Sequence, residues 1–226
     1  LRIGRSGFGS ATLHAGDIIA ADELVVGDLG GANGSLIQSN GLVQTFGVFY
    51  IADNPASVGL VEVYGGALIA TNASARLGDD GNGTLSQYGG LVMIDGASVG
   101  RGSNAVGRVN LRGGQMQPGS MSLGRFATAQ GTLAVSGGTL DMSTSTLYVG
   151  REGLGTASFS NGVSLVETVI VAASNTAAGI LQIRGGSLTA GQLLAERPAA
   201  QIQFSAGSLT ITQASAVANG AAFVVG

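Results

Sequence analysis

The segment Gly131–Gly150 reads GTLAVSGGTLDMSTSTLYVG, and apolar and polar residues alternate in three short stretches of it. The apolar members of these stretches are Leu133 and Val135, Leu140 and Met142, and Leu147 and Val149. Alternation with period two is typical of a strand that buries one face, because successive side chains on a strand point to opposite sides. Glycine, serine, threonine and aspartate separate the stretches, so we expect three short strands joined by turns.

The same arrangement recurs along the chain, and a glycine after the first strand marks each copy. The markers are Gly16, Gly41, Gly66, Gly90, Gly114, Gly138, Gly162, Gly186 and Gly207. The interval between neighbouring markers is constant to within one position, except that the last interval, from Gly186 to Gly207, is shorter. A nearly fixed period of this size indicates a repeat architecture, in which each unit buries its apolar face against its neighbours.

The spacing selects among repeat architectures. A unit of about 24 residues is too short for a four-stranded propeller blade, which needs roughly 40 or more. No segment has the helical spacing of a leucine-rich repeat. We therefore predict an all-β parallel β-helix, or β-solenoid, with about nine coils of three short strands. We expect residues 1–226 to form a single solenoid segment of a longer protein, with atypical coils after about residue 196.

The inward positions of the predicted strands form two apolar columns. On the first strand the column is Leu36, Val61, Leu85, Val109, Leu133, Ala157, Leu181 and Ile202. On the second strand it is Val43, Leu68, Val92, Met116, Leu140, Ser164, Leu188 and Leu209. With strands about 4.8 Å apart, the coils would make a rod roughly 40 Å long around this core.

Length changes inside the repeat come in pairs of residues. The glycine that closes the third strand follows its marker later in the pairs Gly66/Gly78 and Gly138/Gly150 than in the pairs Gly90/Gly100 and Gly114/Gly124, and the following turn compensates. We interpret this as a two-residue slide of the third strand, which keeps the same side chains inward. Stacked coils require such compensation, whereas independent hairpins do not.

Composition excludes several functions. The chain has 40 glycines among 226 residues, no cysteine, only arginine as a basic residue, and a net charge of -3. The absence of a basic cluster argues against nucleic-acid binding, and no apolar run approaches the ~20 residues of a membrane-spanning helix. We expect no cofactor, no metal and no catalytic residue, so the chain is predicted not to be an enzyme.

The unit resembles the repeat of type V secretion (autotransporter) passengers and of PEP-CTERM-associated proteins. Three strings carry this resemblance: GTLSQYGGLVMIDGASVGR at 83–101, GTLAVSGGTLDMSTSTLYVGR at 131–151 and GILQIRGGSLTAGQLL at 179–194. The resemblance implies a protein secreted from a bacterium or displayed on its surface. The string AQIQFSAGSLTITQ at 200–213 departs from the pattern, since it lacks the paired glycine.

Few residues carry the types that catalysis or metal binding needs. His14 is the only histidine, and no serine partner for a nucleophilic pair is identifiable, so we interpret it as a turn or surface residue. The turn GDDGNG at 78–83 gathers Asp79, Asp80 and Asn82, whose oxygens could bind calcium, but a solvated turn explains the same residues. We favour the solvated turn, because the chain lacks a ligand set repeated in every coil.

Charged residues occupy one turn position in six successive coils, namely Asp28, Asp53, Asp79, Arg101, Arg125 and Arg151. Stacking would bring like charges together, which is mildly unfavourable unless an opposite charge lies nearby. We expect these side chains to be exposed and splayed. The alternative is a charge-matched contact with a neighbouring rod.

Outward positions of neighbouring coils carry apolar and aromatic side chains. We predict an interface formed by Tyr64, Ile69, Tyr88, Leu91 and Met93, because contiguous apolar surface commonly marks a contact site. The expected function is a structural rod or stalk that associates with copies of itself or with neighbouring repeats, with surface glycans as further partners. The alternative is a carbohydrate-acting β-helix enzyme, a lyase or hydrolase, whose active loops lie outside this segment.

Overall fold

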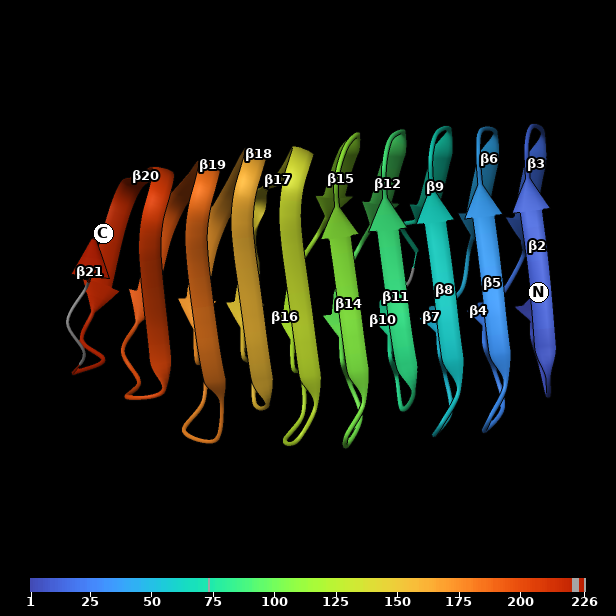
Figure 1. The fold of residues 1–226 in the computed structure, drawn as a ribbon, viewed down its shortest axis with the longest axis horizontal. Coiled ribbons are helices and arrows are strands. Elements are labelled where there is room, and N and C mark those ends of the chain that lie inside the picture. The colour runs from blue at the N-terminus through green and yellow to red at the C-terminus, as the bar shows by residue number, and fades with distance from the viewer. Residues whose placement is uncertain (73, 221–223, 226) are drawn as a thin grey trace.

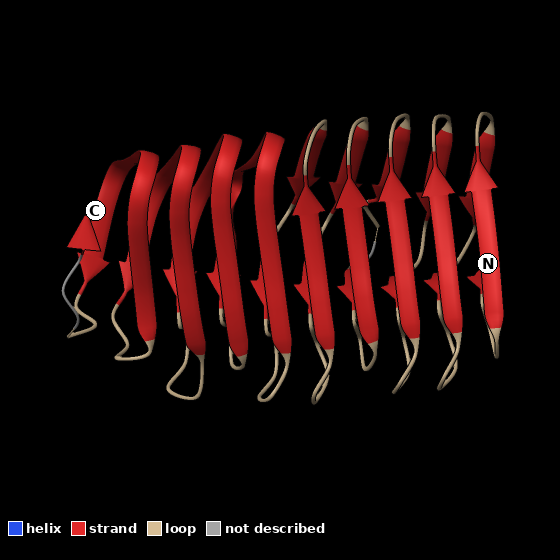
Figure 2. Cartoon of the chain, viewed as in Figure 1, coloured by secondary structure: helices blue, strands red, loops and turns tan. Residues whose placement is uncertain are grey.

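The structure is a computed structural model that describes residues 1–72, 74–220 and 224–225. The chain winds into a rod of about nine turns, and its two termini lie at opposite ends of the rod (Figure 1). All regular elements in the described residues are strands (Figure 2). None of them is a helix that could cross a membrane.

Three strand positions recur around each coil. The first position holds β2 (Phe8–Leu13), β5 (Asn33–Gln38), β8 (Val58–Val63), β11 (Asn82–Gln87) and β14 (Val106–Leu111). The second holds β3 (Asp17–Ala20), β6 (Leu42–Thr45), β9 (Ala67–Ala70), β12 (Leu91–Ile94) and β15 (Gln115–Pro118). The third holds β1 (Arg2–Ile3), β4 (Leu24–Val26), β7 (Phe49–Ile51), β10 (Ala75–Leu77), β13 (Ala97–Val99) and β16 (Met121–Leu123).

The later coils differ from the predicted pattern of three separate strands. There one long strand follows each coil through its corners, in β17 (Gln130–Val149), β18 (Leu154–Val171), β19 (Ala178–Ala195) and β20 (Ala200–Val217). Backbone pairing continues through the corner, where Ser136 aligns with Asn161, at the cost of register shifts on either side. β20 keeps the stack despite its shorter spacing, and β21 (Val224–Val225) pairs with β20.

Each strand pairs in parallel with the equivalent strands of the coils before and after it. In the first position, Leu85 aligns with Val61 on one side and with Val109 on the other. This register confirms the parallel β-solenoid predicted from the period. It also makes every residue a neighbour of the residue at the same position in the next coil.

The third strands do not slide, so that interpretation was wrong. Ala75 aligns with Ala97, and the Gly100 amide donates to the Leu77 carbonyl at 2.8 Å, so β10 and β13 are in register. The two missing residues come from the corner between the second and third strands, which is shorter before β13 than before β10. A corner tolerates a length change at lower cost because its residues do not belong to the inter-coil ladder.

The marker glycines have a backbone conformation that other residues adopt at a cost. All nine markers have positive φ, between 67° at Gly186 and 92° at Gly207. The left-handed region costs an L-residue about 1–2 kcal/mol, so glycine makes the turn between the first and second strands available in every coil. A second left-handed position closes the third strand, and there Ala52 and Ala172 replace glycine with φ of 61° and 54°.

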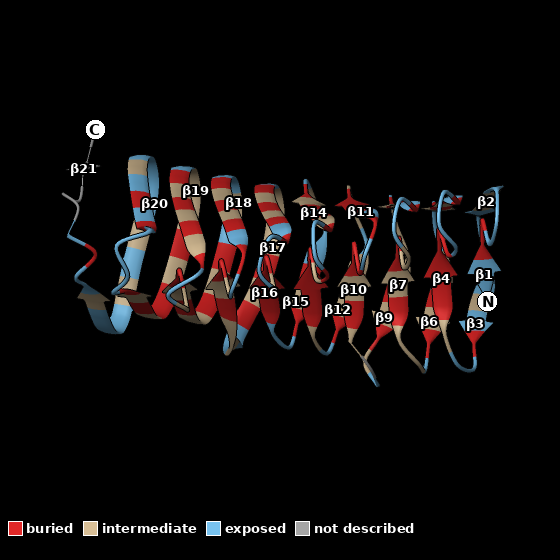
Figure 3. Ribbon diagram, turned by 90° about the horizontal axis from the view of Figure 1, so that it is seen from below, coloured by how far each residue is buried: buried red, intermediate tan, exposed pale blue. Residues whose placement is uncertain are grey.

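The two predicted apolar columns lie inside the rod. The first-strand column is buried throughout, and the second is buried from Val43 to Leu188. Figure 3 shows the buried residues along the inner faces of the central coils and more exposed residues at both ends. In β20, Leu209 is only partly buried, because the full coil that covers the other members of its column is present on one side only.

We expect Leu133→Asp to lower the free energy of unfolding by roughly 4 kcal/mol, because Leu133 is fully buried and a carboxylate there would have no partner. Thr132→Asp should cost less than about 1 kcal/mol, since Thr132 points outward and aligns with Arg108. Chemical denaturation of the two variants checks this. Equal losses would contradict the inward assignment of Leu133.

We expect Gly107→Ala to destabilise the rod by about 3 kcal/mol. Gly107 faces inward on β14, and an added methyl group would collide with the backbone of Gly100 and Leu77. Gly96→Ala is the matched control, since its methyl group would approach only the Ser120 hydroxyl, at 3.4 Å. Thermal melting of both variants tests the difference, and a similar Tm for the two would mean that the first strand does not pack this tightly against the corner.

Candidate functional surfaces

An aromatic ladder runs along the corner between the first and second strands. The rings of Tyr64 and Tyr88 are stacked, with centroids 4.6 Å apart and planes 3° apart. The guanidinium carbon of Arg112, in the next coil, lies 5.3 Å from the Tyr88 ring centroid. Tyr64 and Tyr88, which the sequence placed at outward positions of neighbouring coils, are therefore in contact, and Tyr64 at the end of the ladder is 48% exposed.

The predicted apolar residues of the second strands lie side by side. Met93 aligns with Ile69, and Leu91 aligns with Ala67. Leu42, which the sequence interpretation missed, aligns with Ala67 on its other side and so extends the row. We call Leu42, Ala67, Ile69, Leu91 and Met93 the apolar patch. These side chains are half-buried rather than fully exposed, because in-register neighbours cover one another's flanks.

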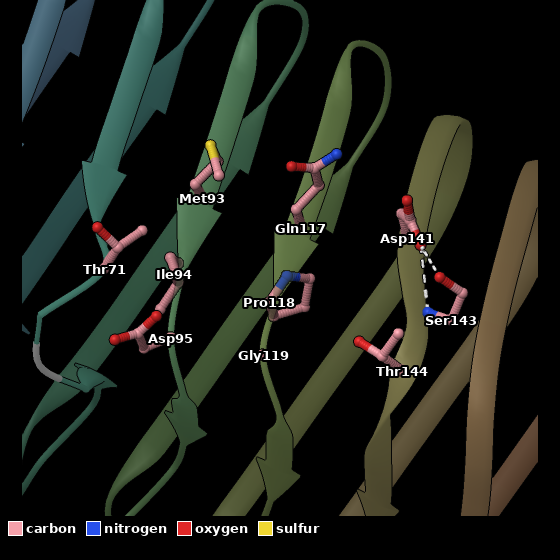
Figure 4. A pocket seen from close by; sticks show the side chains of 10 residues that line it. All are labelled: Thr71, Met93, Ile94, Asp95, Gln117, Pro118, Gly119, Asp141, Ser143 and Thr144. Carbon is pink, nitrogen blue, oxygen red and sulfur yellow. Dashed lines mark hydrogen bonds between the residues drawn. The ribbon is translucent and has the colours of Figure 1, made fainter.

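A shallow hollow borders the apolar patch at Met93 (Figure 4). Its volume is about 320 Å³, and it crosses four coils where the second strands end. Asp95 and Asp141 line it, and the Asp141 carboxylate accepts hydrogen bonds from the Ser143 hydroxyl at 2.8 Å and the Ser143 amide at 3.2 Å. Gln117 and Pro118 also line it, between Asp95 and Asp141 (Figure 4).

The aspartates of the charged turn column are not splayed into solvent, so that expectation was wrong. Asp28 is 1% exposed and Asp79 is 5% exposed. Arg2 donates a hydrogen bond to Asp28, while Arg76 and Arg101 approach Asp79 at 3.2 and 2.7 Å. Arg2 and Arg76 come from outward positions of the third strands, so opposite charge reaches the column from the adjacent face.

Asp53 lies between these two paired aspartates and has no ion pair among the described residues. The Asn54 side-chain amide donates to its carboxylate at 3.2 Å. Burial, followed by the negative charges of Asp79 and Asp28, raises the pKa of Asp53 to about 6. The ionised carboxylate at this position therefore lowers the stability of the folded state near neutral pH.

The arginines of the column, and Arg76 on β10, lie against aromatic rings. The pairs of guanidinium and ring, 5.0 to 5.6 Å apart, are Arg76 with Tyr50, Arg101 and Arg125 with Phe126, and Arg151 with Tyr148. Such contacts contribute roughly 0.5–1 kcal/mol each at exposed sites. The sequence interpretation missed the rings, although Tyr50 and Tyr148 could have been found as outward residues of the third strand.

The remaining candidates for chemistry lie apart from these surfaces. His14 is exposed on the first coil. Asp79 and Asp80 share a turn, but the Asp79 oxygens accept hydrogen bonds from two arginines. Within the ranges that the structure describes, no group of three histidine, cysteine, aspartate or glutamate side chains is placed to hold a metal ion.

Fold and surfaces together define the class of this protein as a parallel β-solenoid with an aromatic ladder, an apolar patch and an arginine-rich edge. In comparisons with known proteins, no family model, curated protein or solved structure matches the chain. The function is therefore inferred from the geometry of these surfaces.

We expect Asp53→Asn to raise stability at pH 7 by on the order of 1 kcal/mol, after allowance for solvent screening. The folded-state pKa of Asp53 is about 6, against 3.8 in the unfolded chain. The folded state therefore binds more protons between these values, and the contribution of Asp53 to stability falls as pH rises from about 4 to 6.

The measurement is the difference in Tm between Asp53→Asn and the parent from pH 4 to pH 7.5. The difference should be small at pH 4 and should grow through pH 6. Asp95→Asn, which removes an exposed carboxylate from another corner, is the control for the loss of one negative charge. A difference for Asp53→Asn that stays constant with pH would contradict the assigned burial.

Proposed function

We propose that this chain is a structural rod that associates with copies of itself or with neighbouring repeats through the apolar patch and the tyrosine ladder. The observation that supports it is the contiguity of Leu42, Ala67, Ile69, Leu91 and Met93 on one flat face of the solenoid. Flat rows of half-buried apolar side chains suit a second flat surface better than a small ligand.

The solenoid is suited to a mechanical role because its surface repeats with the coil. A rod of stacked coils carries a binding or anchoring element at a distance set by the number of coils. We propose that it acts as a stalk, fibre or coat subunit, secreted by a bacterium or held at its surface. The resemblance of its repeat to autotransporter and PEP-CTERM-associated repeats supports this location.

A carbohydrate-acting enzyme is the less favoured function for this segment. Glycosidases need two carboxylates that flank the scissile bond, one of them commonly held protonated by an apolar environment. In the hollow, Asp95 is exposed and Asp141 accepts two hydrogen bonds from Ser143, so neither carboxylate lies in an apolar environment. We therefore propose that the described segment has no catalytic role, and that surface glycans are bound rather than cleaved.

We expect the triple variant Ile69→Ser, Leu91→Ser and Met93→Ser to weaken self-association at least tenfold in Kd, because it removes the apolar side chains of the patch. The three side chains point outward, so Tm should fall by only a few degrees. Sedimentation equilibrium measures the association, and circular dichroism checks the fold.

The matched control is Val163→Ser with Leu165→Ser, at the same outward column positions three coils further along. Polar residues separate this pair from the patch, so the control should associate like the parent. If the triple variant assembled as well as the parent, the apolar patch would not be the interface. The charged turn column would then be the next surface to test.

A further inference from the structure

Arg125 and Arg151 differ from Arg101, the third arginine of the charged turn column, because no carboxylate of the described residues pairs with them. Arg101 pairs with Asp79, and Arg76 pairs with the same carboxylate. Among the described residues, no ion pair is formed by Arg125 or Arg151. Two cations in adjacent coils are thus left without a counter-charge in a protein whose net charge is -3.

Both guanidinium groups are nevertheless held in fixed positions. Arg125 donates from Nη1 to the Ser98 hydroxyl at 2.9 Å, and Arg151 donates from Nη1 to the Ser122 hydroxyl at 3.3 Å. Ser98 and Ser122 are buried and aligned on the adjacent strands β13 and β16. Each arginine therefore uses one donor on the described part of the chain and retains others for a ligand.

Arg125 carries its charge against an electrostatic penalty. Burial, followed by the positive charges of Arg151 and Arg101, lowers the pKa of Arg125. An anion placed between Arg125 and Arg151 would relieve this repulsion. The like-charged pair is thus already arranged for an acidic ligand, since its side chains need little reordering on binding.

We propose that Arg125, Arg151 and the adjacent ring of Phe126 bind an acidic polysaccharide through its carboxylate or sulfate groups. The planar guanidinium recognises both groups with paired hydrogen bonds. Phe126 is 38% exposed beside Arg125, so it offers apolar surface to the C–H groups of a sugar ring. This is the site at which the glycan binding of the proposed function would take place. It depends on the proposed function only for the kind of ligand, which is a glycan.

The shape and charge of the surroundings favour a saccharide polymer over other anions. Arg125 and Arg151 hold equivalent positions in coils about 4.8 Å apart, along an open edge that an extended chain could follow. A nucleic acid would present many closely spaced phosphates to only two unpaired cations at this site.

The test is calorimetric titration of the whole chain with oligogalacturonate and, separately, with a sulfated dextran oligomer at low salt. We expect at least one to bind, and Arg125→Gln with Arg151→Gln to weaken that binding at least tenfold. Arg108→Gln with Arg184→Gln removes the same charge from exposed positions elsewhere and should bind like the parent. The two oligomers distinguish carboxylate from sulfate recognition.

Methyl-esterified oligogalacturonate, which has the same backbone without charge, should bind at least tenfold more weakly than the acid. The site is refuted if neither oligomer binds the parent, if the Arg125/Arg151 variant binds like the parent, or if oligothymidylate binds more tightly than both oligomers. Sedimentation of the Arg125/Arg151 variant should give unchanged self-association. Loss of glycan binding with normal assembly therefore separates this site from the apolar patch.

Discussion

The parallel backbone ladder between coils determines the rest of this structure. It places each residue about one strand spacing from the residues at the same position in the neighbouring coils. A side chain is thus surrounded by its own equivalents, whether they are apolar as at Leu85, aromatic as at Tyr64, or charged as at Asp53. The ladder converts the sequence period into rows of like side chains, and each kind of row is stabilised in a different way.

The structure contains three kinds of row: apolar, aromatic and charged. Apolar rows turn inward and form the core, and aromatic rows stack, as Tyr64 does on Tyr88. In rows of charge, the opposite sign comes from another face, as from Arg76 on β10 to Asp79, or from the next coil of the same row, as from Arg101 to Asp79. Asp53 and Arg125 have no such partner among the described residues, and the pKa of each is shifted in the direction that favours its neutral form. These are the positions at which an external partner changes the energy most.

The period and the alternation within it were sufficient to predict the coil, the parallel register and the inward columns. The reason is that the turn after the first strand requires a positive φ, as at Gly138 with φ of 72°. Glycine meets this requirement and therefore marks the period in the sequence. The burial of Asp28 and Asp79 could not be predicted in the same way, because it depends on how long arginine side chains turn toward the column. Arg2 reaches Asp28 from the preceding coil, and Arg76 reaches Asp79 from three residues earlier in the same coil. The two-residue change before β13 was seen in the sequence but assigned to the strand rather than the corner.

Of the candidate surfaces, the sequence predicted the aromatic ladder and most of the apolar patch, since both follow from equivalent positions. Leu42 extends this row by one coil, because it aligns with Ala67. The contacts of Arg125 and Arg151 with Ser98 and Ser122 reach back to the preceding coil. A column-by-column comparison cannot find such contacts, because donor and acceptor belong to different columns.

The direction of the inter-coil hydrogen bonds has a mechanical consequence. Bonds such as that from the Gly100 amide to the Leu77 carbonyl, and from the Gly124 amide to the Val99 carbonyl, join successive coils. A pull between the two ends of the rod therefore loads the coil boundaries in series, while the bonds within one boundary share the tension. Extension then requires a whole boundary to open together, so the rod resists stretching as a set of stiff elements and lengthens in steps of one unwound coil.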